Sequence, residues 1–453
     1  MNAFTDNTLY TCTENIEEYL SLQTLSNIKI SELLDDSGNE LLIYPHSFSA
    51  CEDEIGSQYL FSLQTSWKEN KCTRAILETG NLAGFIGLNG HSVSIHSRFS
   101  NNEEDFFLHY MLQKVLGINV VNLSHGTTDE QIFDFRLYLF PKLLKDALAQ
   151  GIYKSYQRNE YNDANVRGVI DINRHLKTNM PFKGRIAYRT REFSTDNSVT
   201  ELIRHTIEYI CQSSFGKMLL ENDAETRASV AQIIAATPNY SRQDREKVIT
   251  SNSKIVNHPY YFRYTPLQKL CLQILNHERI KYGVKEDKIY GVLFDVSYLW
   301  EEYIATTLTK QGFKHPNNKK GTGQIYLAKN KFPRYPDFYR EEDGYIIDAK
   351  YKRMINRDDI HQMITYMYRL RGKNGTFIQP SSNKICQRDC YDLLGYGTEC
   401  NSTLQIVSYP VSQITSDYNQ FVSDMVLSEN MLKAMLSMRG PFNYSNMLRN
   451  SDL

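Results

Sequence analysis

Residues 336–351, which read PDFYREEDGYIIDAKY, constrain the fold of this chain more than any other segment. Two runs of apolar and aromatic residues flank a charged turn that contains Gly344, and glycine readily adopts the backbone angles of a tight turn. We therefore predict two neighbouring antiparallel strands. Because side chains alternate along a strand, Asp348 and Lys350 should share one face, and the turn should bring Asp337 towards Asp348.

Such an arrangement would gather residues that can carry out chemistry. Two carboxylates a few ångströms apart repel each other and hold protons unless a cation joins them. Hard oxygen ligands with open water positions suit Mg²⁺, with Mn²⁺ as the alternative, and the backbone carbonyl of Ala349 is a further candidate ligand. Lys350 would lie beside a metal-bound water, where it could orient the nucleophile or stabilise developing negative charge.

A proline-aspartate pair, a gap and then D-x-K is the pattern of the PD-(D/E)xK nucleases, which hydrolyse phosphodiester bonds with a metal ion. The context supports this interpretation, because the D-x-K half falls on an apolar strand and helical segments precede and follow the hairpin. The competing interpretation is an ordinary hairpin whose Asp-Lys pair lies on a solvated surface.

Two flanking helical segments offer further candidate site residues. In YLWEEYIATTL, Glu301 lies at the edge of the apolar face and could reach the metal as a third carboxylate, with Glu302 as the rival position. In DIHQMITYMYRL, Gln362 and Tyr366 are four residues apart and share a helical face, where they could hold Lys350 or touch a phosphate. The alternatives are a solvated helix charge for Glu301 and an ordinary polar-aromatic pair for Gln362 and Tyr366.

The hydrophobic pattern predicts an α/β protein in three parts. Residues 1–102 read as a β-rich N-terminal domain, 103–287 as a mainly helical middle region, and 288–453 as a helix, several strands, a helix and a strand. The last pattern fits a C-terminal PD-(D/E)xK domain.

Charge allows a nucleic-acid substrate only locally, since the net charge of the whole chain is -1. Between residues 311 and 353 basic residues outnumber acidic ones, and two of the acids are the proposed metal ligands. The basic residues there are Lys314, Lys319, Lys320, Lys329, Lys331, Arg334, Arg340, Lys350, Lys352 and Arg353. Such a surround can neutralise phosphates, although a solvated loop would look similar. The chain has no GxxxxGK[ST] motif, so we expect no nucleotide triphosphate hydrolysis by this chain alone.

The remaining features predict a cytoplasmic protein that does not enter a membrane. The N-terminus lacks the basic and apolar regions of a signal peptide, and no apolar run approaches 18 residues. The eight cysteines form no CxxC pair, which favours reduced thiols over a zinc site.

The segment FPRYPDFYREEDGYIIDAKYKR, followed by DIHQMITYMYRL and GTFIQP, resembles the nuclease domain of the McrC family, the cleavage subunits of McrBC-type (5-methylcytosine-specific) restriction systems. Upstream, LETGNLAGFIGLNGHSVSIHSRF is similar to the N-terminal segment of McrC-like proteins, and two stretches within 148–210 resemble the middle region. The resemblance covers most of residues ~75 to ~380.

This resemblance implies roles for matching positions. Asp337 and Asp348 would be metal ligands and Lys350 the catalytic lysine. Gln362 and Tyr366 would form the helix motif after the core, and Glu301 would be the upstream helix acid. It implies a restriction-endonuclease-like core and a partner, McrB, which is an AAA+ GTPase that recognises modified double-stranded DNA and is stimulated by the N-terminal part of McrC.

The sequence therefore predicts a Mg²⁺-dependent DNA endonuclease subunit that works within a GTP-driven restriction system for antiviral defence. Two alternatives belong to other classes. One is an assembly subunit that activates the GTPase without cutting, and the other is a stand-alone PD-(D/E)xK nuclease of repair or transposon type.

Overall fold

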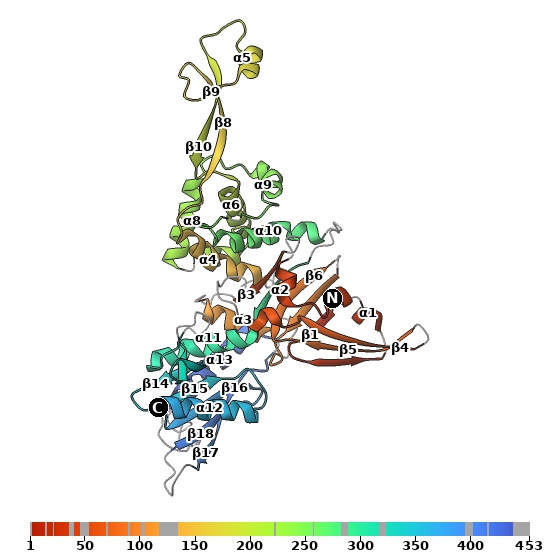
Figure 1. Ribbon diagram of the computed structural model, residues 1–453, viewed down its shortest axis with the longest axis vertical. Helices are drawn as coiled ribbons and strands as arrows, with labels where there is room; N and C mark the ends of the chain where they lie inside the picture. Colours follow the sequence, from red (N-terminus) through yellow and green to blue (C-terminus); the bar gives the residue numbers. More distant parts are fainter. Residues whose placement is uncertain are drawn as a thin grey trace. The chain divides into compact units, whose positions relative to one another are not determined.

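The computed structural model describes residues 2–13, 16–20, 22–35, 40–45, 54–68, 71–88, 91–100, 105–116, 135–221, 223–256, 258–281, 289–316, 323–394, 402–414 and 416–437. Over these residues the chain is a mixed α/β protein, as expected (Figure 1). It forms two compact units, one of residues 1–135 and 285–453 and one of residues 136–284. The division at 102/103 and 287/288 stays a prediction.

The first unit contains a five-stranded sheet in the order β1-β7-β6-β11-β3. Its strands are β1 (Asn2–Thr5), β3 (Glu40–Tyr44), β6 (Leu82–Leu88), β7 (His91–His96) and β11 (Tyr290–Asp295). Strand β11 comes from much later in the chain, yet it pairs antiparallel with β6 and parallel with β3. A Cβ at Gly291 would lie 2.3 Å from the carbonyl oxygen of Phe85, so the close pairing requires glycine there.

A smaller sheet and two short helices complete this part of the unit. They are β2 (Leu9–Cys12), β4 (Phe61–Lys68) and β5 (Lys71–Thr79), in the order β2-β5-β4, with α1 (Ile16–Leu20) and α2 (Ile30–Asp35). Apolar side chains from both sheets, among them Phe4, Phe61, Leu77 and Leu293, form one buried core. This core ties the start of the chain to β11.

The second large sheet of the unit has the order β14-β15-β16-β18-β17. Its strands are β14 (Phe338–Arg340), β15 (Tyr345–Ala349), β16 (Asn374–Ser381), β17 (Gln387–Leu393) and β18 (Ser402–Pro410). The three central strands run parallel, and the two edge strands run antiparallel to their neighbours. The last strand in sequence, β18, therefore lies inside the sheet and not at its edge.

Helices cover both faces of this sheet (Figure 1). Helix α12 (Arg357–Leu370) packs its Met363 and Tyr366 against Ile346 of β15. On the other face lie α11 (Val296–Leu308) and α13 (Tyr418–Ser437), where the ring of Trp300 lies 5.5 Å from that of Tyr409. Because side chains alternate, Asp348 shares the α12 face with Ile346.

A buried carboxylate joins α11, α13 and α3 (Phe106–Val115). The hydroxyl of Tyr110 donates to Glu429 at 2.8 Å, and that of Tyr303 donates to the same oxygen at 3.1 Å. Lys114 completes the set with an ion pair of 3.0 Å to Glu429. Pairing of this kind is what allows a charged group to remain buried.

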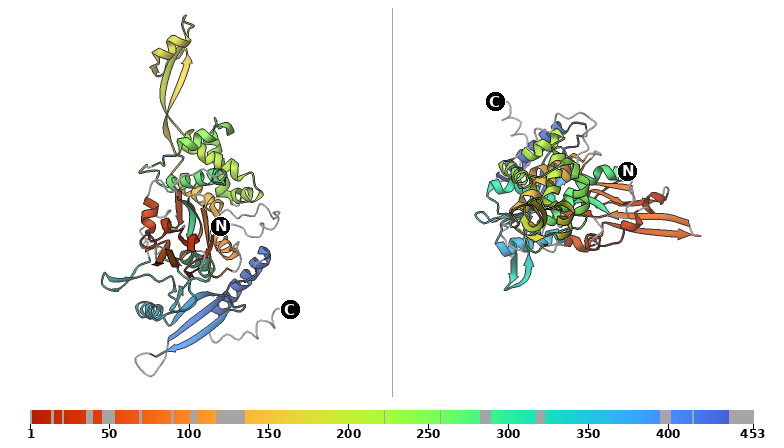
Figure 2. Two further views of the ribbon diagram at one scale, coloured as in Figure 1. Left: turned by 90° about the vertical axis from the view of Figure 1, so that its right-hand side faces the viewer. Right: turned by 90° about the horizontal axis from the view of Figure 1, so that it is seen from above.

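The second unit consists of helices and one long hairpin. The helices are α4 (Phe135–Leu148), α6 (Ser198–Ile210), α7 (Ser214–Glu221), α8 (Ala224–Ala236), α9 (Arg245–Ser251) and α10 (Tyr264–Lys281). The hairpin pairs β8 (Ser155–Asp163) with β10 (Ile186–Ser194) and extends away from these helices (Figures 1 and 2). Its far end carries β9 (Val169–Ile170) and α5 (Ile172–Thr178), where Ile172, Leu176 and Phe182 are exposed.

In the described part of the chain, every helix is too short or too polar to cross a bilayer.

Candidate active site

The predicted hairpin is confirmed by the pairing of β14 with β15. Phe338 lies opposite Ile347 in an antiparallel register, and Gly344 closes the turn with a φ of 63°. Asp337 immediately precedes β14, and its Oδ2 accepts a hydrogen bond of 2.9 Å from the backbone N–H of Ala349. The turn therefore brings Asp337 alongside the end of β15, as the sequence predicted.

Lys350 connects the hairpin to helix α12. Its Nζ lies 2.8 Å from Oδ2 of Asp348 and donates to Oε1 of Gln362 at 2.9 Å. Gln362 in turn donates to the hydroxyl of Tyr366 at 2.6 Å, and that hydroxyl donates to the carbonyl of Tyr335 at 2.9 Å. The structure thus brings together five predicted site residues, which are Asp337, Asp348, Lys350, Gln362 and Tyr366.

Burial and crowding of negative charge set the electrostatics of this cluster. Burial raises the pKa of Asp337 well above its ordinary value, and the charges of Glu301 and Asp348 and a hydrogen bond with Asp348 raise it further. Burial alone would lower the pKa of Lys350, but Asp348 and Asp337 outweigh that effect and raise it. The amine of Lys350 therefore stays protonated, whereas Asp337 resists ionisation.

Glu301 and Glu302 flank the cluster in different ways. Glu301 raises the pKa of Asp337, so its carboxylate lies close enough to affect the site. Glu302 instead pairs with Nε2 of His315 at 3.3 Å, whereas the Nδ1 of His315 lies 3.9 Å from Glu301. Of the two positions that the sequence left open, Glu301 has the electrostatic effect on Asp337.

Two observations bear on whether these residues could hold a divalent cation. The carboxyl groups of Asp337 and the buried Asp348 lie side by side, and the raised pKa of Asp337 shows crowding of negative charge that a cation would relieve. Within the described residues, no three His, Cys, Asp or Glu side chains converge as a metal-binding group. A cation here would therefore rest on Asp337, Asp348 and a backbone carbonyl such as that of Ala349, with water completing its shell.

Sequence reasoning missed two residues of the site. The Nδ1 of His315 donates to the backbone carbonyl oxygen of Asp337 at 3.0 Å, and its ring stacks on that of Phe338 at 4.6 Å. Asp359 binds Lys352 at 2.7 Å and lies 3.7 Å from Lys350. Asp359 was detectable, since it precedes Gln362 by three residues on one helical face, whereas nothing near His315 in sequence signals its position.

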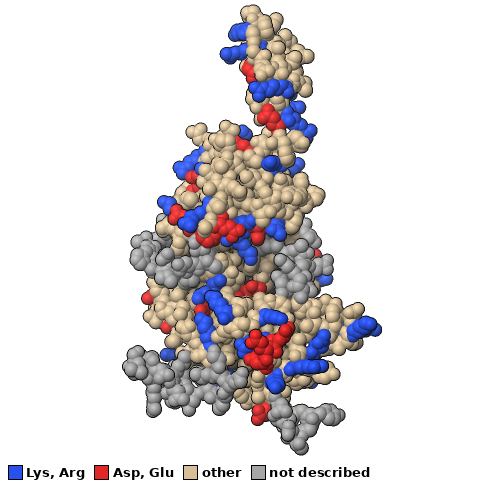
Figure 3. Space-filling view, turned by 90° about the vertical axis from the view of Figure 1, so that its left-hand side faces the viewer, with Lys and Arg blue, Asp and Glu red and all other residues tan. Residues whose placement is uncertain are grey.

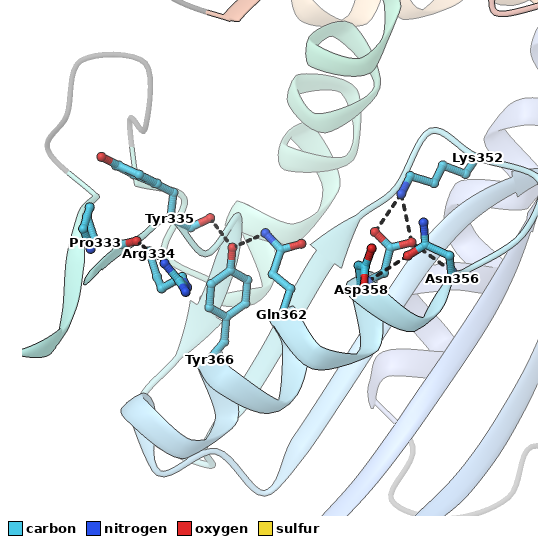
Figure 4. A pocket seen from close by; sticks show the side chains of 9 residues that line it. Pro333, Arg334, Tyr335, Lys352, Asn356, Asp358, Gln362 and Tyr366 are labelled. Carbon is cyan, nitrogen blue, oxygen red and sulfur yellow. Dashed lines mark hydrogen bonds and ion pairs between the residues drawn. The ribbon is translucent and has the colours of Figure 1, made fainter. Parts of the chain in front are cut away.

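A pocket of about 460 Å³ adjoins the cluster (Figure 4). Gln362 and Tyr366 line one wall, and the segment that carries Arg334 and Tyr335 lines another. Lys352 and the start of α12 close the third side. Gln362 lines the pocket and also accepts a hydrogen bond from Lys350. This one side chain therefore links the pocket to the lysine.

The basic residues near the site fall into two groups. Lys314, Arg340, Lys350 and Lys352 pair with carboxylates. By contrast, no carboxylate of the described residues pairs with Lys329, Lys331 or Arg334, which lie on or between β12 (Ile325–Ala328) and β13 (Lys331–Arg334). Lys319 and Lys320 lie outside the described residues. On the face in Figure 3, one group of acidic side chains in the lower part of the view is bordered by basic ones, and other acidic side chains lie elsewhere on this face.

Comparison with known proteins gives a family match and several matching solved structures, among them two from Thermococcus gammatolerans. The family model described as "McrBC 5-methylcytosine restriction system component" matches residues 77–380. No curated protein matches the chain. A chain from McrB AAA+ hexamers with bound McrC, of Thermococcus gammatolerans, is 13% identical at a TM-score of 0.48, covering 96% of this chain and 99% of that one. A chain of the McrBC complex of Thermococcus gammatolerans is 12% identical at a TM-score of 0.31, covering 82% and 96%.

Proposed function

This chain belongs to the McrBC family of 5-methylcytosine restriction system components, and from that premise we propose that it is the metal-dependent DNA endonuclease subunit of a McrBC-like restriction system. Its substrate is double-stranded DNA that carries modified cytosine, and its partner is a McrB-like AAA+ GTPase that recognises the modification. The partner is proposed from family membership. The nuclease role rests on the site.

One observation carries the nuclease proposal. Lys350 is held between Asp348 and Gln362 beside Asp337, so two acids and a fixed ammonium group meet at the end of one strand. A solvated Asp-Lys pair on a sheet edge would not be buried, whereas the side chain of Asp348 is 2% exposed and that of Lys350 17% exposed. The burial supports a PD-(D/E)xK active site over the ordinary hairpin.

Each residue of the site has a proposed task. Asp337, Asp348 and the carbonyl of Ala349 would hold Mg²⁺ or Mn²⁺, which when bound supplies an activated water and charge stabilisation. Lys350, protonated and fixed, stabilises negative charge that develops on the phosphate. Gln362 orients the amine of Lys350, and Tyr366 orients Gln362. Glu301 adjusts the charge of Asp337 from α11.

The path of the DNA is proposed from the unpaired cations. Lys329, Lys331 and Arg334 stand on the hairpin of β12 and β13, and Arg334 also lines the pocket beside Gln362. Cations that no carboxylate neutralises are available to displace counterions from phosphates. This hairpin would therefore contact the DNA backbone next to the phosphate that is cut.

The test compares the wild type with Lys350→Ala, each purified with its AAA+ partner, in GTP and Mg²⁺, on methylated and unmethylated DNA. We expect Lys350→Ala to lose cutting of methylated DNA while the rate of GTP hydrolysis by the complex is unchanged. Equal cutting by the variant would refute the active-site assignment. Cutting by the wild type without a partner would favour a stand-alone nuclease, and GTP hydrolysis without any cutting would favour a non-cutting assembly subunit.

A further inference from the structure

The segment Ser97-Arg98-Phe99 closes around Tyr351, the residue that follows Lys350. The Oγ of Ser97 lies 2.7 Å from the hydroxyl of Tyr351, and Nη2 of Arg98 donates to the backbone carbonyl of Tyr351 at 2.7 Å. The ring of Phe99 meets the ring of Tyr351 edge-on at 5.0 Å, and the guanidinium of Arg98 lies 4.6 Å from the same ring. Three consecutive residues thus hold one tyrosine, and we call them the SRF clamp.

The clamp is itself held rigidly by buried acids. Asp105 accepts a hydrogen bond from the backbone N–H of Ser97 at 2.6 Å and also caps helix α3. Asp6 accepts from the backbone N–H of Arg98, and its Oδ2 lies 3.5 Å from Nε of Arg98. Asn81 accepts from Nη2 of Arg98 at 3.1 Å. The side chain of Arg98 is only 6% exposed, so its position is fixed before it meets Tyr351.

Lys350 needs this support because it lies beyond the end of its strand. Strand β15 ends at Ala349, and the backbone N–H of Lys350 makes one bond to the carbonyl of Ile378, at 2.9 Å. The chain then turns, with the N–H of Lys352 donating to the carbonyl of Lys350 at 3.0 Å. The contact of Arg98 with the carbonyl of Tyr351 fixes the backbone on the far side of the lysine.

We propose that Arg98 is a positioning residue for DNA cleavage, which acts through Tyr351 to hold the backbone of Lys350. This inference rests on the proposed nuclease function. In this proposal Arg98 does not contact substrate or metal. It holds the backbone, and the backbone sets the direction from which the side chain of Lys350 reaches Asp348 and Gln362. The clamp also makes the N-terminal sheet, through β1 and β7, part of the support of the cleavage site.

The test measures single-turnover cleavage of methylated DNA by the full complex with excess protein, in GTP and Mg²⁺. In such a reaction, at saturating protein, the rate constant reports the geometry of the site, and thermal unfolding by circular dichroism reports separately whether the variant is folded. We expect Arg98→Ala to lower the rate constant about 10- to 100-fold, as displaced supporting residues do. Arg98→Lys should fall between that variant and the wild type, because a single ammonium nitrogen cannot replace both Nε, which faces Asp6, and Nη2, which bonds Asn81 and Tyr351.

The matched control is Leu77→Ala. It removes buried volume from the core between the two N-terminal sheets, which does not include Tyr351. We expect it to lower the melting temperature but not the rate constant. An Arg98→Ala variant with the wild-type rate constant, whether or not its melting temperature falls, would overturn the proposal. Should Arg98→Ala fail to fold, Arg98→Lys carries the same comparison.

A second measurement separates this inference from the proposed function. Hydrogen exchange of the amides of Lys350 and Lys352 reports the local backbone without any cleavage. We expect faster exchange at both amides in Arg98→Lys. In Leu77→Ala, exchange at these amides should rise only as much as the lower global stability of that variant requires. If the wild-type complex does not cut DNA, the nuclease function fails, while unchanged exchange in Arg98→Lys would overturn the clamp itself.

Discussion

The Nζ of Lys350 lies 2.8 Å from Oδ2 of Asp348, so the two residues form one buried ion pair where strand β15 ends. A metal ion bound by Asp348 would share its carboxylate with this ammonium group. Without a metal ion, Lys350 compensates the negative charge of Asp348, as a bound cation would also do.

Removing the lysine should make the stability of the protein depend on the metal. Lys350→Ala leaves Asp348 buried without its partner, and loss of one member of a buried pair costs on the order of 3 kcal/mol. We expect a lower melting temperature for Lys350→Ala in EDTA, and a larger rise on adding Mg²⁺ than the wild type shows. Thermal unfolding by circular dichroism checks this, and an equal response of both proteins to Mg²⁺ would contradict it.

Metal binding should release protons from the site. The pKa of Asp337 is raised by burial, Glu301 and Asp348, so without a metal ion this carboxyl keeps its proton to a higher pH than an ordinary aspartate, and a metal ion must displace it. Affinity for Mg²⁺ should therefore increase as pH rises towards that raised pKa. Calorimetric titration in buffers of different ionisation enthalpy measures the protons released, and Asp337→Asn should abolish the release. Binding with no proton release in the wild type would argue against this site.

The two neighbouring glutamates should differ in their effect on cleavage. Glu301 acts on the charge of Asp337, whereas Glu302 pairs with His315. We expect Glu301→Gln to lower the cleavage rate by tenfold or more, on the scale of residues that support metal ligands, and Glu302→Gln to lower it less. Parallel single-turnover assays make the comparison. The reverse order would assign Glu302, through His315, as the acid that matters.

The β12–β13 hairpin should contribute to the salt dependence of DNA binding. Each lysine that neutralises a phosphate adds about 0.9 to the slope of log K against log salt concentration. The double variant Lys329→Ala/Lys331→Ala should therefore reduce the slope by up to about 1.8, measured by fluorescence anisotropy in Ca²⁺. Lys314→Ala is the control, since Lys314 already pairs with Glu341, and its slope should not change.

Stability should fall in acid because of a buried histidine in helix α3. Burial lowers the pKa of His109 from its ordinary value to about 3. The unfolded chain binds a proton to this histidine below about 6.5 while the folded chain does not, so stability decreases as pH falls from about 6.5 towards 3. The loss is at most about 1.4 kcal/mol per pH unit. In His109→Gln, the free energy of unfolding measured with urea should depend less on pH across this window. An unchanged dependence on pH would show that His109 does not titrate there.

Local sequence signals predicted the hairpin and the cluster around it. The turn at Gly344 and the alternation of Asp348 and Lys350 operate within about ten residues, where backbone geometry leaves few alternatives. The spacing of Gln362 and Tyr366 likewise placed both on one helical face, and they do bond to each other. The metal and the reaction stay predictions, because residue spacing gives donors but not occupancy.

Contacts between distant residues were beyond local reasoning. Strand β11 joins the N-terminal sheet, and β18 enters between β16 and β17, because buried strands take whichever neighbours complete a sheet and its core. His315 reaches the site from a segment with no periodic signal of its own. The packing of the whole unit selected these partners, so local sequence patterns could not predict them.

The amino-acid sequence by itself determined which residues are candidates for chemistry here, since the order of Asp337, Asp348 and Lys350 sets them at neighbouring ends of two paired strands. The tertiary structure alone decided what holds them in place. Arg98 meets the carbonyl of Tyr351 across 253 residues of chain, and no local rule links positions so far apart. Only the folding of the N-terminal sheet against the second sheet fixes that contact, because a buried guanidinium must find its acceptors wherever the folded chain presents them.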